Sequence, residues 1–111
     1  MRPNFLSFAF VAALLLVPAG MARADDTITI TIKDHKFTPA EVKIHAGQRV
    51  TVTVVNDDPT PEEFESKTMK VEKVIPGKSK ATVRIGPLEK GRYNFFGEFN
   101  EKTAQGFVVV E

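Results

Sequence analysis

Residues 27–33 read TITITIK, in which isoleucine alternates with threonine or lysine without interruption. Side chains of a strand point alternately to the two faces of a sheet, so the three isoleucines share one face. The stretch therefore predicts a strand with one buried and one exposed face. The same alternation returns in residues 49–55, where three valines share one face.

Further short extended segments follow along the chain, separated by proline, glycine and Asn/Asp turns. They lie at residues 41–45, 62–66, 81–85, 93–96 and 107–110. Short strands with turn signals about every 8–12 residues are typical of an all-β sandwich or barrel. We expect an all-β Greek-key sandwich of about seven to eight strands. Residues 67–73 have no clear pattern, and a helical turn is an open interpretation there.

One local motif supports this fold. Residues 88–93 have the form L-x-x-G-x-Y, which is typical of a tyrosine corner. In such a corner the hydroxyl of the tyrosine, here Tyr93, bonds to the backbone a few residues upstream. The alternative interpretation is an ordinary core tyrosine in a hairpin.

Composition excludes several classes of protein. The 111 residues are enough for one domain, and 15 basic against 14 acidic residues give a net charge of +1. That balance argues against a nucleic-acid partner, which normally selects a basic excess. The absence of cysteine excludes disulfides, thiolate metal ligands and a cysteine nucleophile.

The N-terminal segment has the features of a secretory signal peptide. Arg2 precedes an apolar run at residues 5–17, and Ala22-Arg23-Ala24 is an A-x-A cleavage pattern. A membrane anchor is the alternative, but a span needs about 20 apolar residues and this run has about 13. We expect cleavage after Ala24, a mature domain of residues 25–111, and a periplasmic location.

Carboxylates are the most informative polar residues. If Phe64 turns into the core, alternation places Glu63 and Glu65 together on the opposite face, about 7 Å apart along the strand. Glu98 and Glu101 lie between two strands that should be neighbours, and the loops at one end of a sandwich cluster. Carboxylate oxygens suit hard cations. Solvated surface acids are the alternative.

Other candidate chemistry is weaker. No G-x-S-x-G elbow and no glycine-rich phosphate loop occurs. His35 follows the first strand, His45 precedes a turn, and Met69 is the only methionine after the leader. A thioether ligand would select Cu(I), whereas a single methionine is more often a core residue. The six phenylalanines after the leader are expected in the core.

The motif order resembles the cupredoxin-like domains. It runs F-x-P, V-x-I-x-A-G-x-x-V-x-V-x-V-x-N, E-F-E-S, V-x-P-G, L-x-x-G-x-Y-x-F-x-G-E-F and G-x-V-V-V, over residues 28–110. The most similar group is the EfeO-like type found with bacterial periplasmic iron-uptake systems. The resemblance implies a secreted Greek-key sandwich that binds a metal at one end.

The departures from the blue-copper pattern matter. Gly97 stands where such proteins carry cysteine, Asn100 stands where they carry the next histidine, and the first histidine falls near Glu63. A type 1 copper site is therefore not expected. Acidic residues occupy this region in the iron-uptake group, and Glu63, Glu65 and Glu98 match that pattern. A cysteine ligand of some members would fall near Phe37, and His35 is a candidate replacement.

These observations favour a periplasmic protein that binds iron or copper and serves high-affinity ferrous iron uptake. Glu63, Glu65 and Glu98 are the expected ligands, with His35 and Glu101 as candidate additions. The expected partners are metal ions and an inner-membrane iron permease or other periplasmic iron-uptake proteins. We expect binding and hand-over more than enzymatic activity, with assistance in Fe(II) oxidation left open. The alternatives are a metal-free sandwich that docks another protein, and a Cu(I) carrier that uses Met69 and the histidines.

Overall fold

The computed structural model describes residues 26–111, and the expected signal peptide with its cleavage site after Ala24 lies outside the described residues. The described part contains nine strands and a short 3-10 turn, η2. Their bounds are β1 Asp26–Lys33, β2 Lys36–Thr38, β3 Glu41–Ile44, β4 Val50–Asn56, β5 Glu62–Ser66, β6 Val71–Ile75, β7 Ser79–Ile85, β8 Gly91–Phe96, η2 Glu98–Asn100 and β9 Gln105–Val110. No helix in this part is long and apolar enough to cross a membrane.

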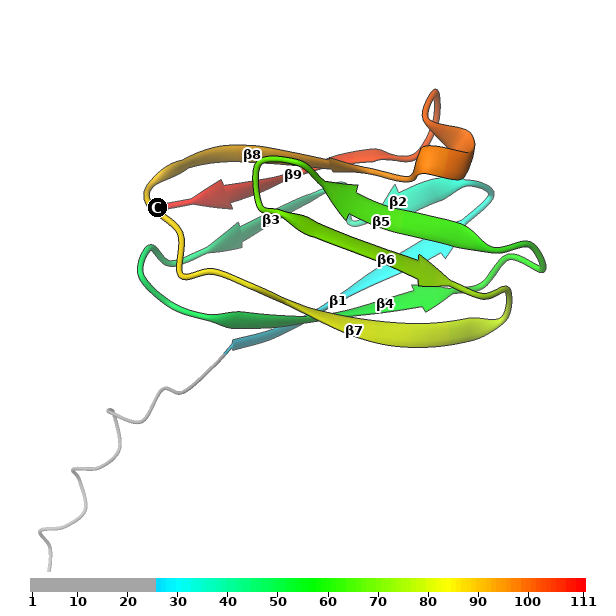
Figure 1. Cartoon of the computed structure of the whole chain (residues 1–111), viewed down its shortest axis with the longest axis horizontal. Helices are drawn as coiled ribbons and strands as arrows, with labels where there is room; N and C mark the ends of the chain where they lie inside the picture. The colour runs from blue at the N-terminus through cyan, green and yellow to red at the C-terminus, as the bar shows by residue number, and fades with distance from the viewer. Residues whose placement is uncertain (1–25) are drawn as a thin grey trace, which may run out of the picture.

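The strands form two packed sheets, which confirms the all-β sandwich (Figure 1). One sheet has the order β2-β1-β4-β7 and the other the order β3-β9-β8-β5-β6. β1 pairs in parallel with β4, and β3 pairs in parallel with β9, whereas the remaining pairs are antiparallel. The parallel pairs join segments that are distant in the sequence.

The two strands that the sequence pattern did not reveal are β2 and β6. The uncertain segment at residues 67–73 is not helical: residues 67–70 form a turn, in which Lys70 has a φ of 59°, and β6 then pairs back on β5. β6 lies at the edge of its sheet, and only its last residue, Ile75, is fully buried. An edge strand with so few inward positions carries little hydrophobic alternation.

The core lies between the sheets. The inward faces of β1 and β4 pack in the core as predicted, with Ile28 half-buried. Phe37, Phe64 and Phe95 pack together with ring centroids 4.8–5.9 Å apart. Not every phenylalanine is core, however. Phe96 and Phe107 are half-buried, and Phe99, the second residue of η2, is 52% exposed.

Two hydrogen-bonded braces fix the ends of the sandwich. The Tyr93 hydroxyl donates to the Glu89 carbonyl at 2.8 Å, which confirms the predicted tyrosine corner. At the other end, the buried Asp58 carboxylate accepts the backbone N–H groups of Asp34 and His35 at 2.8 and 2.9 Å. This second brace ties the β1–β2 turn to the loop that leads into β5.

Candidate metal centre

Four carboxylates from three elements converge on the outer face of the five-stranded sheet. Each offers an oxygen, and the four oxygens lie within 4.8 Å of one another. We call this group the four-glutamate cluster; its members are Glu63 and Glu65 of β5, Glu72 of β6 and Glu98 of η2. Figure 1 shows η2 as the short orange coil between β8 and β9, and its Phe99 N–H donates to the side chain of Glu62 in β5.

Strand register and a turn bring these groups together. Glu65 lies directly opposite Glu72 in the antiparallel β5–β6 pair, so the two side chains share a face. Alternation along β5 places Glu63 on the same face as Glu65. Glu98 is the first residue of η2, which follows β8, the other neighbour of β5. Three adjacent segments therefore supply the four side chains.

Glu63 differs from the other three members because it is buried. It is 3% exposed, whereas Glu65 is half-buried and Glu72 and Glu98 are exposed. Burial, hydrogen bonding with Glu98 and Glu72, and the negative charges of Glu98 and Glu65 raise the pKa of Glu63 to about 8. Its Oε1 atom is buried and has no hydrogen-bond partner among the described residues. Burying a polar atom without a hydrogen-bond partner costs free energy, so its presence in a folded protein needs an explanation.

The neighbouring carboxylate, Glu62, points to the opposite face of β5 and is 1% exposed. Its Oε1 accepts the backbone N–H groups of Glu63 and Phe99 at 2.9 and 3.0 Å, and its Oε2 accepts the side-chain amide of Asn100 at 2.5 Å. Gly97 makes room for it, since a Cβ there would stand 2.7 Å from the Glu62 Cδ. Both oxygens of Glu62 are thus occupied by protein donors.

These contacts test whether a blue-copper centre fits this chain. Gly97 and Asn100, the expected cysteine and histidine positions, lie against Glu62, the neighbour of Glu63. The three residues provide no thiolate and no imidazole, and the carboxylate is already hydrogen-bonded. The side chains present do not fit a type 1 copper ion.

The structure brings together three of the five predicted ligands, Glu63, Glu65 and Glu98. The other two are not members of the cluster. His35 lies in the β1–β2 turn, with its side chain 47% exposed and Nδ1 3.6 Å from an Asp58 oxygen. Glu101 follows η2 and is exposed.

The residues of the Cu(I) alternative are placed differently. Met69 is buried in the hydrophobic core, where its backbone N–H donates to the Ser66 hydroxyl at 3.1 Å. His45 is exposed beyond β3. His45 belongs to no group of three or more clustered His, Asp or Glu side chains in the described part of the chain.

Sequence reasoning missed Glu72 and Glu62. Glu72 was missed because no strand was predicted at β6. Glu62 could have been found, because the alternation that turns Phe64 inward also turns residue 62 inward. A glutamate at a predicted core position requires partners, and that requirement was the available signal.

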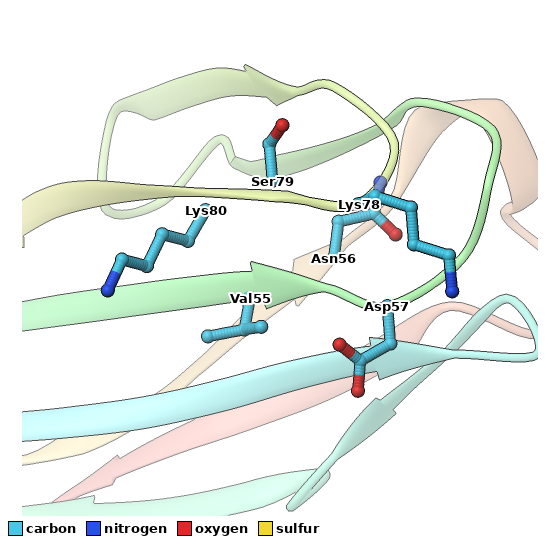
Figure 2. Close-up of a pocket in the computed structure, with 6 residues that line it drawn as sticks. All are labelled: Val55, Asn56, Asp57, Lys78, Ser79 and Lys80. Carbon is cyan, nitrogen blue, oxygen red and sulfur yellow. The ribbon is translucent and has the colours of Figure 1, made fainter.

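A shallow open depression of about 300 Å³ lies elsewhere, on β4 and β7 (Figure 2). Its lining residues are Val55, Asn56, Asp57, Lys78, Ser79 and Lys80. Figure 2 shows the ammonium groups of Lys78 and Lys80 pointing to well-separated places, so they do not converge on one ligand atom. Asn56 is already engaged, because its side-chain amide donates to the carbonyls of Thr60 and Ile75. The four-glutamate cluster is therefore the better candidate site.

Comparisons with known proteins agree with this architecture. The family described as Cupredoxin-like domain matches residues 6–110. An uncharacterized protein of Rickettsia prowazekii (strain Madrid E) is 35% identical over 108 residues, which cover 95% of this chain and 86% of that protein.

Two solved structures show the similarity of fold. The first is the metal-binding domain of the Streptococcus pneumoniae D39 Cu(I)-exporting P-type ATPase CopA with Cu(I), with a TM-score of 0.69, 21% identity, and coverage of 77% of this chain and 84% of that chain. The second is auracyanin A, a blue copper protein of Chloroflexus aurantiacus, with a TM-score of 0.69, 16% identity, and coverage of 79% of this chain and 100% of that chain.

Proposed function

The chain belongs to the family of cupredoxin-like domains, and on that basis we propose that it is a periplasmic iron-binding protein of the EfeO-like type. It captures an iron ion at the four-glutamate cluster and hands the ion to an inner-membrane iron permease. A cupredoxin-like fold related to copper-binding proteins is the starting point. The site, the metal and the location are the proposal.

The observation that carries this proposal is the environment of Glu63. Its buried Oε1 has no hydrogen-bond partner among the described residues, and three further carboxylates offer oxygens within 4.8 Å. Like charges at this distance repel one another unless a proton or a cation lies between them. A bound cation supplies the missing partner and removes the repulsion in one step.

The donor atoms favour a hard or borderline ion. All four are carboxylate oxygens, which suit Fe(II), Fe(III) or Cu(II) better than the soft Cu(I) ion. The solved relatives named above bind copper, but the thioether of Met69 is enclosed in the core of this chain. Cu(II) therefore remains a competitor for the site, and iron is the ion that we propose.

The exposure of the cluster favours capture and release over catalysis. Glu72 and Glu98 are exposed, so the outer side of an ion held here is open to water or to a ligand of a partner protein. Oxidation of Fe(II) would require an electron acceptor, and no described residue supplies one.

The test is a titration of the protein purified after export with its own N-terminal segment. Calorimetry with Fe(II) under argon, Fe(III) citrate, Cu(II) and Cu(I) should give saturable binding of one iron ion and a higher melting temperature. At a free ion concentration of about 100 times Kd, the stabilisation is roughly 2.7 kcal/mol. The double variant E63Q/E98Q should fold and lose tight binding.

The exposed Glu89 provides the matched control, because its side chain lies outside the cluster. E89Q should bind iron as the unmodified protein does. Unchanged iron affinity in E63Q/E98Q would refute the site. Failure of both Fe(II) and Fe(III) to bind, while Cu(II) binds, would refute iron as the cargo, because Cu(II) exceeds Fe(II) in affinity at most sites with such ligands.

One observation favours the alternative of a metal-free sandwich that docks another protein. Val74 and Phe99 are the exposed large hydrophobic residues of the described chain, and both adjoin the cluster. Val74 lies opposite Glu63 in the β5–β6 pair, and Phe99 follows Glu98. Failure of all four ions to bind would make this docking role the leading function.

A further inference from the structure

We propose that Glu62 and Asn100 are positioning residues for the four-glutamate cluster. They do not bind the ion; they hold η2 so that Glu98 stands beside Glu63. This inference rests on the proposed metal-binding function and adds to it the means by which the ligand set is held in place.

The 3-10 turn that carries Glu98 lacks a cap of its own. Its N-cap residue is Gly97, which has no side chain to accept a hydrogen bond from the first N–H groups of the turn. Such groups normally find an acceptor in the N-cap side chain. Here Glu62 supplies the acceptor from β5, because its Oε1 receives the Phe99 N–H at 3.0 Å.

Asn100 completes the attachment. Its side-chain amide donates to Glu62 Oε2 at 2.5 Å, so one carboxylate holds both the second and the third residue of η2. The same carboxylate also accepts the N–H of Glu63 at 2.9 Å. One buried group therefore fixes the backbone beside two cluster members that lie 35 positions apart in the sequence.

Gly97 is part of this arrangement. A Cβ at this position would lie 2.7 Å from the Glu62 Cδ and 2.9 Å from the Ala104 Cβ. Because Gly97 has no side chain, the Glu62 carboxylate can reach the N–H groups of the turn. Glu62 thus takes the place of the missing N-cap side chain.

The functional consequence concerns Glu98. This residue is exposed, and its side chain alone cannot keep one position against solvent. Fixing its backbone beside Glu63 lowers the ordering cost of binding an ion. Groups that orient metal ligands without touching the metal typically change metal affinity by about 10–100-fold. Loss of the Glu62–Asn100 contact should weaken binding towards the lower end of that range.

The experiment is a double-mutant cycle that measures Tb(III) affinity by luminescence, with Tb(III) as a hard-cation probe that is independent of iron. N100A removes the side-chain contact and keeps the backbone hydrogen bonds of η2, and E98Q is the second variant of the cycle. We expect N100A to weaken Tb(III) binding about 10-fold in the otherwise unmodified protein. In the E98Q background, N100A should leave the affinity unchanged.

The matched control is V110A, which alters a buried residue of β9 that pairs with Gly91 and Ile44 and belongs to no part of the cluster. V110A should lower the melting temperature and leave Tb(III) affinity unchanged. Unchanged affinity in N100A, or an equal loss with and without Glu98, would overturn the positioning role.

A metal-free measurement separates this inference from the proposed function. If neither iron nor Tb(III) binds the unmodified protein, the proposed function fails. The NMR order parameter of the Glu98 amide then decides the remaining question. A lower order parameter in N100A supports the positioning role, and an unchanged value overturns it.

Discussion

Glu62 and Glu63 are neighbours in the chain and both are almost fully buried, but their carboxylates have opposite surroundings. Glu62 lies on the core face of β5, and its two oxygens accept three N–H groups. Glu63 lies on the outer face, among three other carboxylates, with one oxygen unpartnered among the described residues. The protein supplies hydrogen-bond donors to both oxygens of Glu62, whereas it places Glu63 among other carboxylates.

This difference separates a structural acid from a binding acid. Hydrogen bonds to a carboxylate favour its charged form, and burial beside like charges disfavours that form. The raised pKa of Glu63 follows from the second situation. Buried acids of one strand can thus be sorted by their hydrogen-bond partners, and an oxygen that no protein donor reaches marks a candidate ligand.

The largest expected effect comes from removing the satisfied carboxylate. E62A leaves the N–H groups of Glu63 and Phe99 and the amide of Asn100 without their acceptor. An unsatisfied buried donor costs about 1–3 kcal/mol, and the donors of Phe99 and Asn100 are only part-buried, so we expect the free energy of unfolding to fall by roughly 3 kcal/mol in total. Urea denaturation measures this loss.

The exposed Glu101 serves as the control, since E101A should change stability by less than about 0.5 kcal/mol. A loss below about 1 kcal/mol in E62A would show that the hydrogen bonds of Glu62 do not stabilise the fold.

The second effect concerns Glu63, whose removal should stabilise the metal-free protein at high pH, whereas removal of Glu62 destabilises it. The pKa of Glu63 is raised from 4.5 to about 8, so the folded protein holds this proton more tightly than the unfolded chain does. The resulting stability is fully present below pH 4.5 and is lost as the pH rises towards 8. We expect the free energy of unfolding of the metal-free protein to fall steadily between pH 5 and pH 8, because the unfolded chain releases this proton first.

E63Q should abolish this dependence and be more stable than the unmodified protein at pH 8 without metal. Thermal melts at several pH values measure the slope, with E89Q as the control that keeps it. A slope that survives in E63Q would assign the titration to another group.

The smallest effect concerns Asp58, a second carboxylate satisfied by backbone groups. Burial alone would raise its pKa, but the N–H groups of His35 and Asp34 outweigh burial and lower it. Its contribution to stability is therefore present above pH 3.8 and is lost as the pH falls further. D58N should cost about 1 kcal/mol at pH 6 and nothing near pH 2. A cost that persists at pH 2 would mean that packing, not charge, makes Asp58 important.

Much of the fold was predictable from local pattern. The uninterrupted alternation of residues 27–33 and 49–55 indicated β1 and β4, and the L-x-x-G-x-Y motif indicated the corner at Tyr93. β6 was not predictable in this way, because an edge strand with a single fully buried residue shows no alternation. Its existence follows from pairing with β5, which is a tertiary property.

The candidate site was predictable in part for the same reason. Strand alternation placed Glu63 and Glu65 on one face, and the clustering of loops placed Glu98 near them. Glu72 belongs to the cluster because β6 pairs with β5 in a register that places it opposite Glu65, and no local sequence pattern predicts that register. Phe99 was wrongly expected in the core, because an aromatic residue in a short turn is positioned by backbone geometry rather than by strand periodicity.

The sheet order has a consequence for how the molecule folds. β9 lies between β3 and β8, although every other strand precedes it in the chain. β3 cannot join its sheet until β9 is available, because β9 is the strand with which it pairs. Chains dominated by such non-local pairing fold on the millisecond to second timescale. The five-stranded sheet is therefore completed only when the last strand of the chain takes its place between β3 and β8.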